Sequence, residues 1–98
     1  MKPCKRMEIV IETPQAKRLS ALLTQVGAGG YTLIPDVRGA GNRGERRADA
    51  LAGDSSNCLF VIACEDQEIV DAIVEAVRPL LTRSGGICLV SDAQWLKH

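Results

Sequence analysis

Apolar and polar side chains alternate near the start of the chain, over residues 7–12. Met7, Ile9 and Ile11 fall on one side of an extended chain, and the residues between them fall on the other. This period of two predicts a strand with one buried face. Residues 57–64 are instead almost continuously apolar, which predicts a central strand covered on both faces.

A helical period follows the first strand. Its apolar positions are Ala16, Leu19, Leu22, Leu23 and Val26. Thr13 and Pro14 predict the start of this helix, with threonine as the N-cap and proline at the first helical position. Gly27 predicts its end, as the glycine just past the C-cap.

A second helical stripe begins at Ile69, behind acidic residues that suit a helix N-terminus. Pro79 predicts that this helix ends or kinks near Arg78. A glycine pair then turns the chain into a short fourth strand at residues 87–90, and residues 91–98 are predicted to form a tail.

A further strand is predicted at residues 31–38, where Pro35 favours an edge position or a bulge. Residues 39–56 form a long connection for so short a chain, and loops of this length are usually functional or disordered. Within it, residues 45–52 could form two helical turns.

The order strand, helix, strand, long loop, strand, helix, strand repeats a β-α-β unit. It predicts a ferredoxin-like α+β sandwich, βαββαβ, with both helices on one face of a four-stranded sheet. The other face would carry Val10, Cys58, Phe60 or their neighbours, depending on register. An apolar second face must be covered, and a homo-oligomer is the simplest cover.

Composition narrows the function classes. The 98 residues suit one domain, and 12 basic residues balance 12 acidic ones. With only Tyr31, Phe60 and Trp95 as aromatic residues, both the charge and the stacking expected of a nucleic-acid-binding protein are missing. No apolar run is long enough for membrane insertion and no signal segment is recognisable, so a cytoplasmic protein is expected.

Cysteine usage indicates neither a zinc site nor a fixed disulfide framework. Cys4, Cys58, Cys64 and Cys88 are dispersed, and the one histidine is His98 at the C-terminus, so close metal-ligand pairs are lacking. Reduced thiols packed as small hydrophobic residues are favoured. The alternative is a redox switch, because Cys4 and Cys58 each precede a strand-like run and could lie at one end of the sheet.

Residues 39–44 match the pattern G-x-G-x-x-G, with Glu65 about twenty residues on. The charged segment between them is too short for a packed crossover helix, so a dinucleotide-binding fold is disfavoured. Two interpretations of residues 39–44 remain: a hinge that binds no ligand, and the base of a loop that contacts an anion. The second is favoured. Residues 82–86 form another glycine turn, and Arg38, Arg43 and Arg83 could line one cleft between subunits with these two turns.

Catalytic signatures are missing. The sequence has no nucleophile elbow, zinc-protease motif or P-loop, and His98 has no acidic or nucleophilic partner nearby in sequence. A protein that is not an enzyme is predicted.

These pieces together resemble the PII signal-transduction family. The matching stretches are residues 30–32, residues 37–44, the strand and helix from Leu59 to Ala76, and the glycine turn into residues 87–90. The branch it looks most like is the PII-like proteins associated with carboxysomes and inorganic-carbon transport. The resemblance implies one domain over residues 1–98, a homotrimer, adenine-nucleotide sites between subunits, and a mobile T-loop at about 39–57.

The resemblance and the two glycine turns imply a nucleotide-binding set: Gly30, Tyr31, Thr32, Arg38, Gly39, Ala40, Gly41, Asn42, Arg43, Ala63, Arg83, Ser84, Gly85, Gly86, Lys97 and His98. Ile87 replaces the family's phosphate-binding lysine, its C-terminal arginine pair is absent, and residues 39–57 contain no tyrosine for uridylylation. ADP or AMP is therefore favoured, with ATP and bicarbonate as further candidate ligands.

Three functional hypotheses follow. The favoured one is a non-enzymatic sensor whose loop at residues 39–57 reports energy and inorganic-carbon status to a protein target in carbon fixation, in the cytoplasm or at a carboxysome. The alternative is an oligomeric structural or docking module that binds no nucleotide. A metal-responsive oligomer would need clustered ligands that the sequence lacks.

Overall fold

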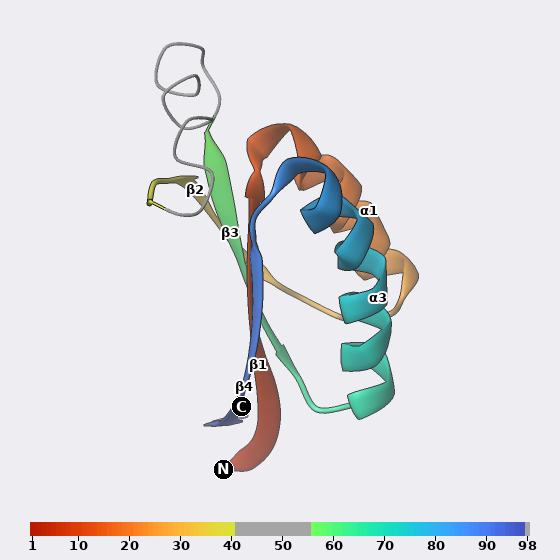
Figure 1. The fold of residues 1–98 in the computed structure, drawn as a ribbon. Coiled ribbons are helices and arrows are strands. Elements are labelled where there is room, and N and C mark those ends of the chain that lie inside the picture. The colour runs from red at the N-terminus through yellow and green to blue at the C-terminus, as the bar shows by residue number, and fades with distance from the viewer. Residues whose placement is uncertain (41–55, 98) are drawn as a thin grey trace.

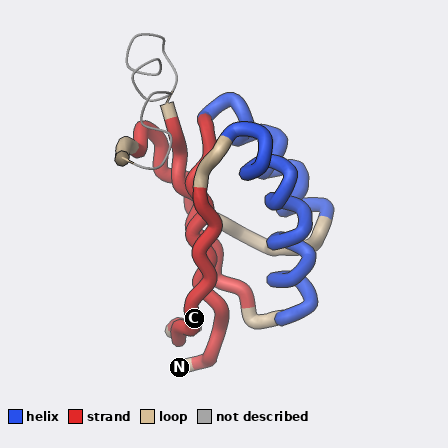
Figure 2. Tube along the Cα trace, viewed as in Figure 1, coloured by secondary structure: helices blue, strands red, loops and turns tan. Residues whose placement is uncertain are grey.

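The computed structural model describes residues 1–40 and 56–97. Its elements are β1 (Lys2–Glu12), the 3-10 turn η1 (Thr13–Gln15), α1 (Ala16–Gln25), β2 (Thr32–Val37), β3 (Asn57–Cys64), α3 (Gln67–Ser84) and β4 (Ile87–Trp95). All three strand pairings are antiparallel, and the sheet order is β2-β3-β1-β4. Figure 1 shows α1 and α3 side by side on one face of this sheet, and Figure 2 shows the resulting two layers.

This architecture confirms the predicted ferredoxin-like α+β sandwich. The short helix predicted at residues 45–52 lies outside the described residues.

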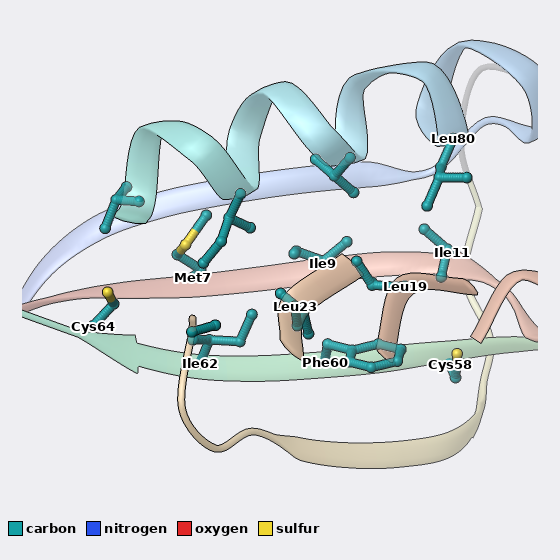
Figure 3. Close-up of a cluster of buried hydrophobic side chains, with 14 residues drawn as sticks. Met7, Ile9, Ile11, Leu19, Leu23, Cys58, Phe60, Ile62, Cys64 and Leu80 are labelled. Carbon is teal, nitrogen blue, oxygen red and sulfur yellow. The ribbon is translucent and has the colours of Figure 1, made fainter. Parts of the chain in front are cut away.

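The core lies between the helices and one face of the sheet. Met7, Ile9 and Ile11 are completely buried, as their alternation predicted, and α1 contributes Leu19 and Leu23. The register pairs Ile9 with Phe60 and therefore places both on the helix-covered face. Figure 3 shows these side chains gathered between the two layers.

The other sheet face differs from two expectations. Cys58 and Phe60 belong to the core rather than to this face, whereas Val10 does lie on it, beside Leu59. β3 is central in the sheet, but only every second residue is buried, and Leu59 and Val61 remain partly exposed. The prediction that both faces of β3 are covered is thus wrong for one chain, because the two helices pack on the same side.

The start of α1 was predicted incorrectly, and its end correctly. Thr13 does not act as an N-cap; its Oγ1 lies 2.7 Å from Ser56 Oγ, and a 3-10 turn precedes α1. At the other end, Gly27 has a φ of 80° and donates its N–H to the Thr24 carbonyl. Ala28 donates to the Leu23 carbonyl, which completes a Schellman motif.

Helix α3 begins at an acidic cap, as predicted, but continues past its proline. The Asp66 carboxylate accepts a hydrogen bond of 2.9 Å from the Glu68 N–H. The helix does not end near Arg78: it runs through Pro79 to Ser84. Leu80, buried against the core, supplies packing energy that outweighs the hydrogen bond lost at the proline.

Both outer strands of the sheet were located correctly, but β4 is longer than predicted. Pro35 lies in edge strand β2, next to a register irregularity between Ile34 and Val37. β4 continues to Trp95 instead of ending at Val90, so most of the predicted tail is a strand. The reason is pairing with β1, which itself begins at Lys2 and offers a partner for every residue of β4.

The cysteines are separate, and all four are free thiols. Cys4 pairs with Ala93 and Cys58 pairs with Ile11, near opposite ends of β1, so the expectation that the two share one end of the sheet is wrong. Cys4, Cys58 and Cys64 are buried. Burial raises the thiol pKa of both Cys58 and Cys88, which disfavours the reactive thiolate.

Candidate functional site

The sheet face that carries no helix is here called the outer face. Strand alternation and register place on it Val10, Ile34, Leu59, Val61, Ala63, Ile87 and Leu89. Ile34, Ile87 and Leu89 are 42%, 51% and 53% exposed. So much apolar surface on one face of a small chain indicates an interaction surface.

The predicted nucleotide-binding residues separate into two groups. The loop-end group lies at the end of the sheet where β2 ends and β4 begins, on its two opposite edges, and consists of Arg38, Gly39, Ala40, Arg83, Ser84, Gly85 and Gly86. The tail-end group lies toward the end of β3, and consists of Gly30, Tyr31, Thr32, Ala63 and Lys97. Gly41, Asn42, Arg43 and His98 lie outside the described residues.

One chain does not bring these groups together. Ala63 lies six residues beyond Asn57 on β3, roughly 20 Å at the rise of a strand. Asn57 itself pairs with Val37, at the loop-end group. A ligand the size of a nucleotide that contacts both groups would need the tail-end group of one chain beside the loop-end group of another.

The glycine turn of the loop-end group is fixed by close backbone contacts. Gly86 has a φ of 122°, and a Cβ atom there would lie 2.2 Å from the Val10 carbonyl oxygen. The Gly85 N–H donates to the Leu81 carbonyl at 2.8 Å, and the Ser84 hydroxyl donates to the Leu80 carbonyl at 2.9 Å. The turn is thus held tightly against β1 at the end of α3.

The two ends of the long connection meet at the loop-end group. Val37 pairs with Asn57, and Thr13 binds Ser56 through both its N–H and its hydroxyl. Asp36, just before, has a φ of 58°, the one positive value at a non-glycine residue among those described. This left-handed backbone coincides with the irregularity in β2 and redirects the chain toward Arg38.

In the tail-end group, Tyr31 is held within its own chain. Its hydroxyl donates to Ser20 Oγ at 2.7 Å, and its ring centroid lies 5.1 Å from that of Phe60. The side chain therefore lies toward the helix layer. Thr32 is on the outer face instead, where it pairs with Val61, two residues from Ala63.

The sequence presented Glu65 as helix N-terminal charge and as the acid of a disfavoured dinucleotide-binding motif, but the structure gives it another role. Its Oε2 accepts a hydrogen bond from Trp95 Nε1 at 2.9 Å and lies 3.2 Å from Lys97 Nζ, while Oε1 lies 3.6 Å from Lys2 Nζ. The hydrogen bond from Lys97, helped by the Lys2 and Lys97 charges and by Trp95, lowers the pKa of Glu65. In the sequence, the single tryptophan was the one signal for this role of Glu65, because a packed indole N–H needs a hydrogen-bond acceptor.

Two further observations concern metal binding and membrane insertion. Among residues 1–40 and 56–97, no three histidine, cysteine, aspartate or glutamate side chains gather as metal ligands would. Neither α1 nor α3 is long and apolar enough to cross a bilayer.

Known structures share this fold over nearly the whole chain. CPII from Thiomonas intermedia K12, a PII-like protein, superposes with a TM-score of 0.79 in a complex with ADP, AMP and bicarbonate, at 24% identity over 98% of this chain and 96% of that one. Its complex with ADP and bicarbonate gives 0.79 at 26% identity, over 95% and 88%. A structure described as that of a PII-like signaling protein from Thermus thermophilus gives 0.74 at 27% identity, over 97% and 91%.

No curated protein matches the sequence. The family model described as nitrogen regulatory protein P-II, in contrast, matches residues 4–98. That match spans every element of the fold except the first residues of β1. The chain therefore belongs to the P-II family, as its resemblance to PII-like proteins predicted.

Proposed function

We propose that residues 1–98 form one PII-like signalling domain that binds an adenine nucleotide between the subunits of a homotrimer and catalyses no reaction. The observation that carries this proposal is the separation of the candidate residues into two groups joined by an exposed apolar face. Copies that cover one another's outer faces would place the tail-end group of one beside the loop-end group of the next. The similar CPII, bound to ADP and bicarbonate, supports the choice of ligand.

The charges of the two groups favour a short phosphate chain. Arg38 and Arg83 supply two guanidinium groups at the loop end, and Lys97 supplies one ammonium group at the tail end. Ile87 occupies the position where a lysine would add another cation after the glycine turn. ADP or AMP is the proposed ligand, and ATP is expected to bind more weakly.

The readout is proposed to be the segment at residues 39–57, the T-loop in PII-like proteins. Its two ends are joined at the loop-end group, so a nucleotide bound there would bias the conformations that the segment presents to a protein target. Bicarbonate is a proposed co-ligand, and a target in carbon fixation, in the cytoplasm or at a carboxysome, is the proposed setting.

Calorimetry with AMP, ADP and ATP tests this function. We expect saturable binding of ADP and AMP, and a loss of about tenfold or more in ADP affinity for Arg83→Gln, because a charge-assisted contact to phosphate disappears. Arg78→Gln is the matched control, since Arg78 lies on the same helix and pairs with Glu75. Absence of binding by all three nucleotides at millimolar concentration would contradict the proposal.

A further inference from the structure

Four residues from three distant parts of the sequence meet around one carboxylate. This Glu65 cluster consists of Glu65 in the β3–α3 turn, Lys2 in β1, Trp95 at the end of β4, and Lys97 beyond it. Lys97 Nζ also lies 5.3 Å from the centroid of the Trp95 ring, at the distance of a cation–π contact. Lys97, which lies beyond the end of β4, is thus held by side-chain contacts.

The cluster lies beside the tail-end group. Ala63 and Glu65 are two residues apart, and register places Ala63 opposite Arg6 on the outer face. Lys2 and Trp95 are register partners on that same face. A carboxylate here can thus draw the Lys97 ammonium toward the outer face beside Ala63.

We propose that Glu65 is a positioning residue. It holds the Lys97 ammonium group beside Ala63, where this group contributes positive charge to the nucleotide site. The inference rests on the proposed function, because it assigns Glu65 a role in that same site. Lys97 has a long side chain on a terminal segment, and it would otherwise lose rotamer freedom when a ligand binds. Glu65 and Trp95 hold the Lys97 side chain in one place before a ligand binds, so less rotamer freedom is lost on binding.

Glu65 could instead compete with a phosphate for Lys97, but the charges favour positioning. Two ammonium groups surround one carboxylate, so the cluster keeps a net positive charge and can still attract an anion. Lys97 and Lys2 have side chains that are 50% and 58% exposed, which leaves room for an added ligand. Without Glu65, the ammonium groups of the two lysines would repel one another, and Lys97 would no longer be held beside the nucleotide site.

A double-mutant cycle measured by ADP calorimetry separates positioning from general destabilisation. Glu65→Gln should weaken ADP binding about three- to tenfold, and Lys97→Gln about as much. The double variant should bind no more weakly than Lys97→Gln alone, because Glu65 acts through Lys97. Glu75→Gln is the control: it also removes one carboxylate from an ion pair, on the exposed side of α3, and should leave ADP affinity unchanged.

Trp95, the single tryptophan, gives an independent readout of the cluster. Its emission should shift to longer wavelength in Glu65→Ala, as the indole N–H loses its hydrogen-bond acceptor, and stay unchanged in Glu75→Ala.

The outcomes distinguish this inference from the proposed function. If the wild-type protein binds ADP but Glu65→Gln binds it equally well or more tightly, the positioning role is wrong. It is also wrong if Glu65→Gln weakens binding as much in the Lys97→Gln background as in the wild type. If the wild-type protein binds no ADP at all, the proposed function itself fails.

Discussion

At the scale of single residues, the turn before β4 depends on the absence of a side chain. Gly86 combines a left-handed φ with a backbone approach to Val10 that leaves no room for a Cβ atom. The requirement is steric, and it follows from how β4 must enter beside β1.

Gly86→Ala should therefore lower the free energy of unfolding by about 2 kcal/mol or more, because strain and a backbone clash add. Urea denaturation followed by circular dichroism measures this change. Gly30→Ala is the control, since a Cβ there meets nothing within 4 Å. Equal unfolding midpoints for Gly86→Ala and Gly30→Ala would contradict the steric account.

A second residue-scale prediction concerns pH and the Glu65 cluster. The cluster lowers the pKa of Glu65 from the ordinary 4.5, so the charged carboxylate is favoured in the folded state. Its contacts with Lys2, Trp95 and Lys97 should be intact above pH 4.5 and should be lost as the pH falls through the lowered pKa.

An acid titration of Trp95 emission measures this transition, with circular dichroism to identify global unfolding. The midpoint is expected below pH 4.5, and Glu65→Gln should abolish it. A transition above that pH, or one that persists in Glu65→Gln, would show that another group controls Trp95.

Residues whose role is local were predictable, and those with distant partners were not. Gly27 ends α1 as expected because a helix end needs a left-handed residue within the same turn. Thr13 has the chemistry of an N-cap, but its hydroxyl finds Ser56, forty-three positions away. Glu65 likewise looked like helix charge because its partner Trp95 is thirty positions away.

At the scale of elements, Pro79 shows tertiary packing overriding a local signal. The proline removes one backbone hydrogen bond from α3, yet the helix continues for five residues beyond it. The helix is stable because its buried stripe, which ends at Leu80, packs on the sheet.

Pro79→Ala is expected to stabilise the protein by about 1–2 kcal/mol, since alanine restores the hydrogen bond, while the freer unfolded chain offsets part of the gain. Chemical denaturation measures it. Arg78→Ala, at the neighbouring exposed position, should leave the free energy of unfolding nearly unchanged. A less stable Pro79→Ala variant would mean that the ring packs usefully against the chain.

Strand lengths were the weakest element-scale prediction. Residues 91–95 are mostly small or polar and show no strand pattern, but they pair with β1 from Lys2 to Arg6. Pairing to an existing strand provides backbone hydrogen bonds that no local propensity records. The position of β2 was predicted correctly because Pro35 favours an edge or a bulge, and β2 has both.

At the scale of the whole molecule, the outer face and the two groups of candidate residues both indicate contact between copies of the chain. The sequence predicted a second apolar face but not its residues, because a shift of one position in register exchanges them. The structure fixes that register and separates the loop-end group from the tail-end group along β3. A site that uses both groups thus requires contact between copies, which is the central claim of the proposed function.

Native mass spectrometry of the protein with ADP tests this claim most directly, because it reports the number of chains and the number of bound nucleotides in one species. The account predicts a complex of three chains that carries up to three ADP molecules, and no ADP on single chains. A species with ADP bound to one isolated chain, or trimers that never retain ADP, would contradict it.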